Sequence, residues 1–218
     1  MAAVATSGFE NTLALLRRFT PKRSLVERCE MCSQGLPVEH DHLVEPARHK
    51  LMCACTACAI LFDGQVNGQY KRVPRVIEFL QDFEMSEGQW DTLRIPIEMA
   101  FFLLSSPQGK MIALYPSPAG AIESLLPLDT WEEISQANPA LNRMKADVVA
   151  LLANRVGSDR GSQPEYYLVP IDECYKLVGL IRTHWRGLSG GTEVWREIRA
   201  FFGQLKKQSG IKSEAMHG

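Results

Sequence analysis

The chain has 218 residues, 45% of them hydrophobic, which is enough to bury the core of one large domain or two small ones. Its 24 Lys and Arg residues nearly balance its 25 Asp and Glu residues, and the net charge of -1 argues against a nucleic-acid partner. No apolar stretch approaches the roughly 20 residues that a membrane-spanning helix needs. Residues 1–8 lack the basic start of a signal peptide, so we expect a cytoplasmic protein without a membrane span.

The first expected element is a short amphipathic helix near the N-terminus. Ser7 and Glu10 have the spacing of a capping box, and apolar residues then recur at helical intervals until about Phe19. Pro21 ends this helix, because proline cannot continue it. A cysteine-rich segment follows, and the turn-rich residues 63–68 lead out of it.

The remainder of the chain predicts strands followed by helices. Residues 97–104 and 111–115 are apolar runs joined by a polar stretch with Pro and Gly, which predicts two strands in a hairpin. A helix capped by Asp129 should end near residue 136, and apolar residues at helical spacing predict two more helices, starting at Asp172 and Thr192. This order is typical of an α+β domain.

We therefore predict an α+β protein with three segments. Residues 1–66 form the N-terminal helix and a small metal-binding module, residues 67–206 form a larger α+β domain, and residues 207–218 form a disordered tail. The tail sequence, which begins near Lys206, is mostly polar and has few apolar residues to hold it on a core.

The cysteines carry the most specific pattern in the sequence. Five of the six lie within 30 residues, which in a reducing compartment indicates a metal or redox site. Two Cys-x-x-Cys turns separated by about 20 residues can complete one tetrahedral site, as in zinc-ribbon and treble-clef-like modules. We expect this site to use Cys29, Cys32, Cys55 and Cys58, which leaves Cys53 as the spare cysteine.

Zinc is the expected metal, with iron or an iron-sulfur cluster as the alternative, because thiolates alone do not select the metal. Rubredoxin-like knuckles usually carry Gly after the second cysteine, whereas Ser33 and Ala59 stand there in this chain. Cys53 is either an alternative ligand or a reactive thiol, whose ionised form the preceding Arg48 and Lys50 would favour if it is exposed. A metal-free redox pair in the first Cys-x-x-Cys turn is a further alternative.

Two histidines between the cysteine pairs are the next candidates. His40 and His42 could be replacement ligands, catalytic groups or outer neighbours of the metal site, and we favour the last. The order of Cys-x-x-Cys, His-Asp-His and Cys-x-x-Cys resembles the treble-clef nucleases of the His-Asn-His class, in which such a His activates water. The Asn normally expected after the last cysteine is missing, since Ala59 occupies that place, and only Asn67 is nearby.

The polar region 165–191 has no assigned role. Cys174 and His184 would be ten residues apart on one helix, about 15 Å along its axis, so they cannot form a catalytic pair. We expect both to be packing residues. Gly190 and Gly191 fit a helix connection better than an anion-binding loop, since no phosphate-binding motif surrounds them.

Several motifs together resemble an uncharacterised bacterial family of cysteine-knuckle proteins that are encoded beside nickel-iron uptake hydrogenases of the actinobacterial type. The motifs are Cys29-Glu-Met-Cys32, His40-x-His42-Leu, Cys53-Ala-Cys-Thr-Ala-Cys58, Ala100-Phe-Phe, Tyr115-Pro-Ser-Pro-Ala-Gly120, Leu168-Val-Pro-Ile-Asp172 and His184-Trp-Arg-Gly-x-Ser-Gly-Gly191. The resemblance implies a role in hydrogenase assembly or maturation and assigns no catalytic residue. We therefore expect a non-enzymatic metal-binding accessory protein whose client is a hydrogenase subunit or assembly factor. A rubredoxin-like or thiol redox protein and a treble-clef nuclease are the alternatives.

Overall fold

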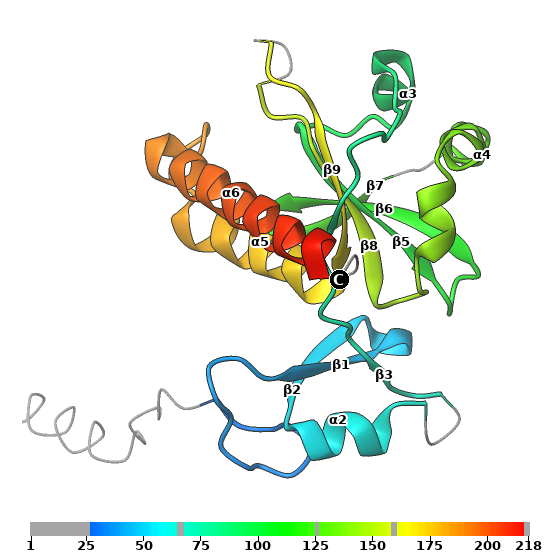
Figure 1. The fold of residues 1–218 in the computed structure, drawn as a ribbon. Coiled ribbons are helices and arrows are strands. Elements are labelled where there is room, and N and C mark those ends of the chain that lie inside the picture. Colours follow the sequence, from blue (N-terminus) through cyan, green and yellow to red (C-terminus); the bar gives the residue numbers. More distant parts are fainter. Residues whose placement is uncertain (1–26, 65–67, 125–126, 158–160, 216–218) are drawn as a thin grey trace, which may run out of the picture.

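The computed structural model describes residues 27–64, 68–124, 127–157 and 161–215. The chain forms a small three-stranded module and a larger domain, in which helices lie on both sides of a six-stranded sheet (Figure 1). This arrangement confirms the predicted α+β class with a cysteine module ahead of a larger domain. The helix expected near the N-terminus lies outside the described residues. Among the described helices, none is long and apolar enough to cross a membrane.

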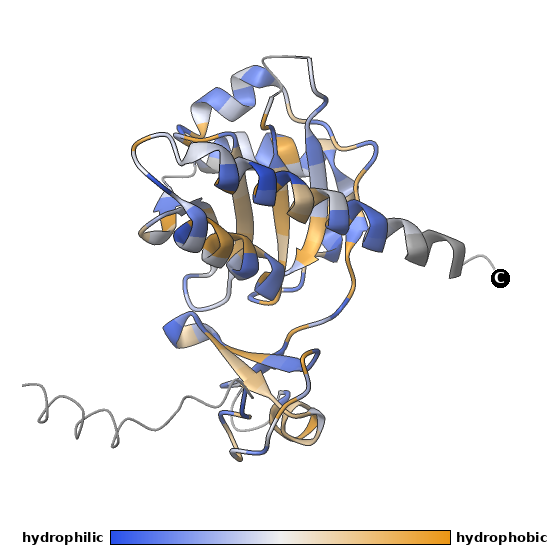
Figure 2. Cartoon of the chain, turned by 90° about the vertical axis from the view of Figure 1, so that its left-hand side faces the viewer, coloured by the Kyte–Doolittle hydropathy of each residue, from blue (hydrophilic) through white to orange (hydrophobic). Residues whose placement is uncertain are grey.

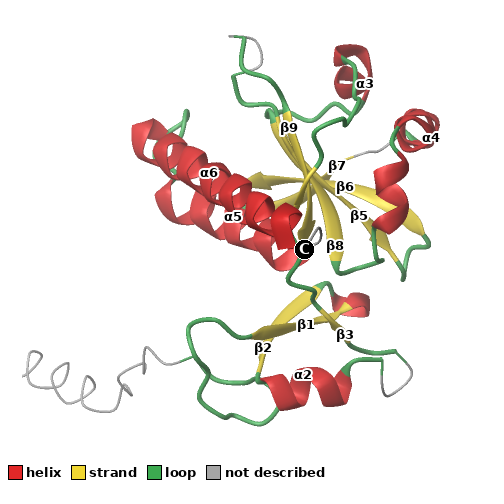
Figure 3. Ribbon diagram, viewed as in Figure 1, coloured by secondary structure: helices red, strands yellow, loops and turns green. Residues whose placement is uncertain are grey.

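The small module consists of a cysteine turn, a β-hairpin, a short helix and a third strand (Figure 3). Strand β1 (Asp41–Glu45) pairs antiparallel with β2 (Lys50–Ala54), and a single 3-10 turn (Pro46–Arg48) connects them. Helix α2 (Thr56–Phe62) follows β2 directly, and β3 (Lys71–Arg72) then pairs with the free edge of β1. The order of knuckle, hairpin and helix is that of a treble clef, one of the two predicted arrangements.

The larger sheet is antiparallel throughout and has the strand order β4-β9-β8-β5-β6-β7. Its strands are β4 (Glu78–Phe79), β5 (Met99–Ser105), β6 (Lys110–Ser117), β7 (Gly120–Ser124), β8 (Val149–Asn154) and β9 (Glu165–Pro170). Strands β5 and β6 are the two that the sequence predicts, and they pair with each other as expected. On the other side of β5 the sheet continues with β8 and then β9, and neither of these strands was predicted.

Two pairs of helices cover the two faces of this sheet (Figure 1). Helices α5 (Ile171–His184) and α6 (Gly191–Ala215) lie on one side, and α3 (Glu87–Thr92) and α4 (Leu128–Ala137) lie on the other. The three predicted helices are α4, α5 and α6. A further 3-10 segment (Pro139–Arg143) follows α4.

Two details of these helices differ from the sequence analysis. Pro127 occupies the cap position of α4 and makes no side-chain cap bond, so the prediction that Asp129 caps this helix was wrong. Asp129 lies instead in the first turn, where its negative charge interacts favourably with the helix dipole. Helix α6 continues past Lys206 to Ala215, so this stretch is helical where a disordered tail was expected. The apolar face of α6 includes the buried Leu205, which holds the helix on the sheet up to that point.

Alternating side chains of the central strands supply two separate cores. Phe101 and Leu103 of β5 pack with α5 and α6, whereas Ala100 and Phe102 pack with α3 and α4. The strands are strongly apolar between the two helical layers (Figure 2). Both faces of β5 are therefore buried, which explains its continuous apolar sequence.

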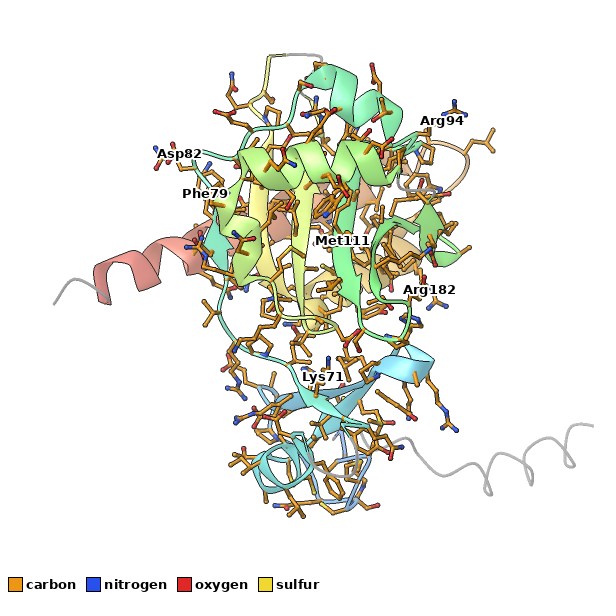
Figure 4. All side chains as sticks on the ribbon, turned by 90° about the vertical axis from the view of Figure 1, so that its right-hand side faces the viewer. Lys71, Phe79, Asp82, Arg94, Met111 and Arg182 are labelled. Carbon is orange, nitrogen blue, oxygen red and sulfur yellow. The ribbon has the colours of Figure 1, made fainter. Side chains whose placement is uncertain are left out.

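The small module is joined to the larger domain by apolar and polar contacts. Val44 of β1 and Val73, just after β3, belong to the same core as Ile171 at the start of α5. Lys71 lies at the junction (Figure 4), and its Nζ atom donates to Oδ2 of Asp147 at 2.6 Å. Residues 71–72 belong to the sheet of the small module, beyond the predicted boundary between residues 66 and 67.

Candidate metal centre

The four predicted cysteine ligands meet at one point in the small module. Cys29 and Cys32 lie in the turn before β1, Cys55 precedes α2 and Cys58 lies in its first turn. Their sulfur atoms all lie within 4.8 Å of one another, and the Cys32 and Cys55 sulfurs are 3.7 Å apart. Four sulfurs at about 2.3 Å from a zinc ion would be about 3.8 Å apart, whereas a disulfide measures about 2.05 Å. All four cysteines are free thiols, and this group could bind a metal ion.

Backbone hydrogen bonds shape the first cysteine turn. The N–H of Cys29 donates to the carbonyl of Gln34 at 2.8 Å, and the N–H of Ser33 donates to the carbonyl of Cys29 at 2.7 Å. Ser33 has a φ of 63°, in the left-handed region that favours glycine. The chain therefore forms the tight knuckle without the glycine that usually follows its second cysteine, and this serine accepts the strained conformation.

The second cysteine pair is built on the start of α2 instead of on a second knuckle. Cys55 occupies the cap position, and its sulfur accepts a hydrogen bond from the N–H of Cys58 at 3.5 Å. Ala59 continues the helix by donating its N–H to the carbonyl of Cys55 at 2.9 Å. Because the chain is helical at this point, no glycine is needed after Cys58.

The pKa values of two thiols in the group are shifted in opposite directions. Burial raises the pKa of Cys29, but N–H groups of Cys55, Cys32 and Met31 donate hydrogen bonds to it and lower the pKa to about 6. Burial raises the pKa of Cys58, and its hydrogen bonds with neighbouring cysteine sulfurs raise it further, to about 12. One thiol thus ionises readily while another resists, because several negative sulfurs cannot share one small space without a cation. A bound divalent ion would provide that positive charge and displace the remaining protons.

Cys53 lies outside this group of four. Burial raises its pKa, and the carboxylates of Glu27 and Glu30 raise it further. Lys50 is held by Glu30, with 2.7 Å between Nζ and Oε2, and the side chain of Arg48 reaches Glu45. Acidic side chains therefore engage both of the basic residues that were expected to favour the Cys53 thiolate if this cysteine is exposed, and Cys53 is only partly exposed.

The structure brings Cys53 together with the two predicted histidines. His42 on β1 lies directly opposite Cys53 on β2, and His40 precedes His42 by two residues. Ligand atoms of all three side chains lie within 4.8 Å of one another, and the two imidazole ring centres are 4.7 Å apart. Sequence reasoning placed the histidines around the four cysteines, whereas the structure groups them with Cys53.

One residue at this cluster was missed by sequence reasoning. Asp172, at the start of α5, accepts a hydrogen bond from His42, with 3.0 Å between its Oδ2 and Nδ1 of the ring. The two residues are 130 positions apart in sequence. No local pattern could have revealed this pair, because it depends on how the small module packs against α5.

Cys174 and His184 do not meet, as expected from their spacing on one helix. Cys174 is fully buried in the core, while Nδ1 of His184 lies 3.2 Å from Oε1 of Glu193. Gly190, with a φ of 85°, lies so close to Val194 and Trp185 that a side chain could not fit. Residues 185–190 form the connection between α5 and α6, in agreement with the sequence analysis.

The fold and the cysteine group define an α+β protein in which a treble-clef-like module with a potential metal site precedes a larger β-rich domain. Comparison with known families gives a match over residues 28–209 to a family of unknown function, DUF5947. The chain belongs to this family. Comparisons with curated proteins and with solved structures found no match.

Proposed function

We propose that the chain is a non-enzymatic accessory protein in which four cysteines hold a structural zinc ion. The observation that carries this proposal is that the group supplies four sulfur atoms that all lie within 4.8 Å of one another. A site with four protein ligands has no open position for water or substrate, which is typical of structural zinc and unlike catalytic zinc.

The small module also presents an apolar surface that suits protein contacts. Ile60 and Leu61 are neighbours on α2 and are 59% and 56% exposed, and Val38, ahead of β1, is 97% exposed. Exposed apolar side chains on a helix that is anchored by a metal site can dock a partner without further ordering. The proposed client is a subunit or assembly factor of a nickel-iron hydrogenase, and the support for this client is the resemblance found in the sequence motifs.

The metal assignment can be tested with X-ray absorption of a Cys53→Ser variant, in which the only cysteines left in the module are the four of the group. We expect one tightly bound zinc with four sulfur neighbours and a colourless protein. Iron and a red or brown colour would favour the redox alternative. Predominantly nitrogen and oxygen neighbours, or DNA cleavage that depends on a divalent metal, would refute the structural assignment.

The client can be tested by co-expressing the full chain with each hydrogenase subunit and measuring co-elution in size-exclusion chromatography. Replacing both Ile60 and Leu61 by Asp should abolish co-elution while the zinc remains bound. A matched variant, Leu188→Asp, alters an exposed leucine in the α5–α6 connection and should bind normally. Absence of any complex with the wild-type chain would refute the hydrogenase client.

A further inference from the structure

The geometry points to a second metal site, separate from the four cysteines, in which His40, His42 and Cys53 bind a late first-row divalent ion. It goes beyond the proposed function, which uses only the four-cysteine group. The three ligand atoms lie within 4.8 Å of one another, so small side-chain rotations bring them to bonding distance from one ion. Two imidazoles and a thiolate suit Zn²⁺, Co²⁺, Ni²⁺ or Cu²⁺ and exclude the hard ions Mg²⁺ and Ca²⁺.

The hairpin brings the ligands together. His42 and Cys53 are directly opposed in the antiparallel pair β1–β2, and opposed residues project their side chains on the same face. His40 precedes His42 by two residues, the spacing that places two side chains on one face of an extended chain. Three potential ligands therefore share one face of the hairpin.

Both histidines have the hydrogen bonds that prepare a ring for metal binding. Nδ1 of His42 lies 3.0 Å from the carboxylate of Asp172, and Nδ1 of His40 lies 3.0 Å from the carbonyl oxygen of Pro37. Each acceptor fixes the proton on Nδ1 and leaves Nε2 with a free electron pair. A carboxylate or carbonyl behind a metal-binding histidine is the usual arrangement in proteins.

The free nitrogen of His40 is the observation that most directly calls for a ligand. The His40 side chain is 5% exposed, and its buried Nε2 atom makes no hydrogen bond. A buried polar atom without a partner is costly, and the great majority of such atoms are satisfied in folded proteins. The carboxylate of Glu27 lies 3.6 Å from this nitrogen on the more exposed side of the cluster and can approach the ion as a fourth ligand.

This site differs in kind from the four-cysteine group. Three protein ligands leave at least one position for Glu27, water or another molecule, whereas four sulfurs leave none. The site also joins two parts of the chain, because its ligands belong to the small module and Asp172 belongs to α5 of the larger domain.

Titration with CoCl₂ tests the proposal on the full-length chain. After dialysis to remove loosely bound metal, native mass spectrometry should count one added Co²⁺ beyond the ion in the four-cysteine group. The visible absorption spectrum of the added Co²⁺ should be that of a four-coordinate ion. It should include a charge-transfer band from one cobalt-sulfur bond. Cobalt that exchanges into the four-cysteine group would also appear in Cys53→Ser, so the difference between wild type and this variant belongs to the second site.

Variants separate this site from its neighbour and from a folding defect. His40→Ala, His42→Ala and Cys53→Ser should each weaken Co²⁺ binding at least 100-fold while the four-cysteine group keeps its ion. Asp172→Asn should weaken it by about 10- to 100-fold, the usual effect of losing the carboxylate behind a histidine ligand. His184→Ala, which alters a histidine on α5 with its own carboxylate partner, should bind as wild type does.

Three results would overturn the second site. These are a wild-type chain that takes up no ion beyond the first, unchanged Co²⁺ affinity in the three ligand variants, and loss of the four-cysteine ion in Cys53→Ser, which would assign Cys53 to that group. If the four-cysteine group itself binds no metal, the proposed function fails, yet one Co²⁺ per chain that depends on His40 and His42 would still support the second site.

Discussion

Replacing Cys29 with Ser should unfold the small module and leave the larger domain folded. The module buries few large apolar side chains, namely Leu36, Leu43 and Met52. At about 1.5–3 kcal/mol each, these contribute about 5–9 kcal/mol. A structural zinc ion contributes about 10–16 kcal/mol to the folding of a module of this kind, so the metal is the larger contribution. Loss of one buried sulfur ligand removes most of it.

Two measurements distinguish the two parts of the chain. All four tryptophans lie in the larger domain, at Trp90, Trp131, Trp185 and Trp195, so their fluorescence reports on that domain alone. In Cys29→Ser, tryptophan fluorescence should still show a cooperative urea transition of the larger domain, with a midpoint lowered by the loss of the Val44 and Lys71 contacts. Trypsin should cut rapidly at basic residues of the small module.

The matched control is Cys174→Ala, which removes a sulfur from the core of the larger domain. It should lower the urea midpoint while the small module keeps its metal content and its protease resistance, and these two readouts distinguish it from Cys29→Ser. If Cys29→Ser kept both its metal and its resistance to trypsin, the reasoning that the metal holds this module together would be refuted.

Three further predictions concern the larger domain. Burial raises the pKa of Asp147, but hydrogen bonds from Lys71 and Ser106 together outweigh it and hold the pKa below the usual value. Asp147 should therefore stabilise the fold above about pH 4 and lose this effect as the pH falls through its folded pKa. Asp147→Asn should therefore cost about 2 kcal/mol at pH 7 and less at pH 3, measured by urea unfolding. Arg155, which is buried and lies 5.1 Å above the ring of Trp90, should cost about 3 kcal/mol when replaced by Ala and less when replaced by Met, which keeps the packing. Cys174 is fully buried and burial raises its pKa, so iodoacetamide should label it only after urea unfolds the domain, as peptide mass spectrometry would show.

The four-cysteine group was predictable because its geometry is local. Each Cys-x-x-Cys turn brings two sulfurs together within four residues, and a short hairpin between the turns brings the pairs to one point. The grouping of Cys53 with His40 and His42 could not be predicted from the sequence in the same way. The alternation of His40 and His42 indicates a shared face, but their pairing with Cys53 depends on the register of β1 and β2. A 3-10 turn connects these strands, and the sequence carries no two-residue hairpin motif that would fix that register.

The strands of the larger domain show a similar limit. Residues 97–104 lie between polar stretches and were assigned correctly, although both faces of β5 are buried and the residues do not alternate. Strands β8 and β9 are also buried on both faces, and a short apolar run without alternation does not distinguish a strand from a buried helix. The two-residue strands β3 and β4 are too short to have any period, so only their partners define them.

The contacts at the junction link the two proposed metal sites to the larger domain. The hairpin between the two cysteine pairs carries Val44, which packs into the core with Ile171. It also carries His42, which is hydrogen-bonded to Asp172, the residue after Ile171. Because both contacts fall on the first turn of α5, the position of the hairpin determines what surrounds that turn. Loss of the four-cysteine ion would release the hairpin and leave the partly buried carboxylate of Asp172 without its hydrogen bond from His42. The hairpin supplies Val44 to the core between α5, α6 and the sheet, but most residues of that core belong to the larger domain. We therefore expect this change to loosen the junction and lower the stability of the larger domain without unfolding it.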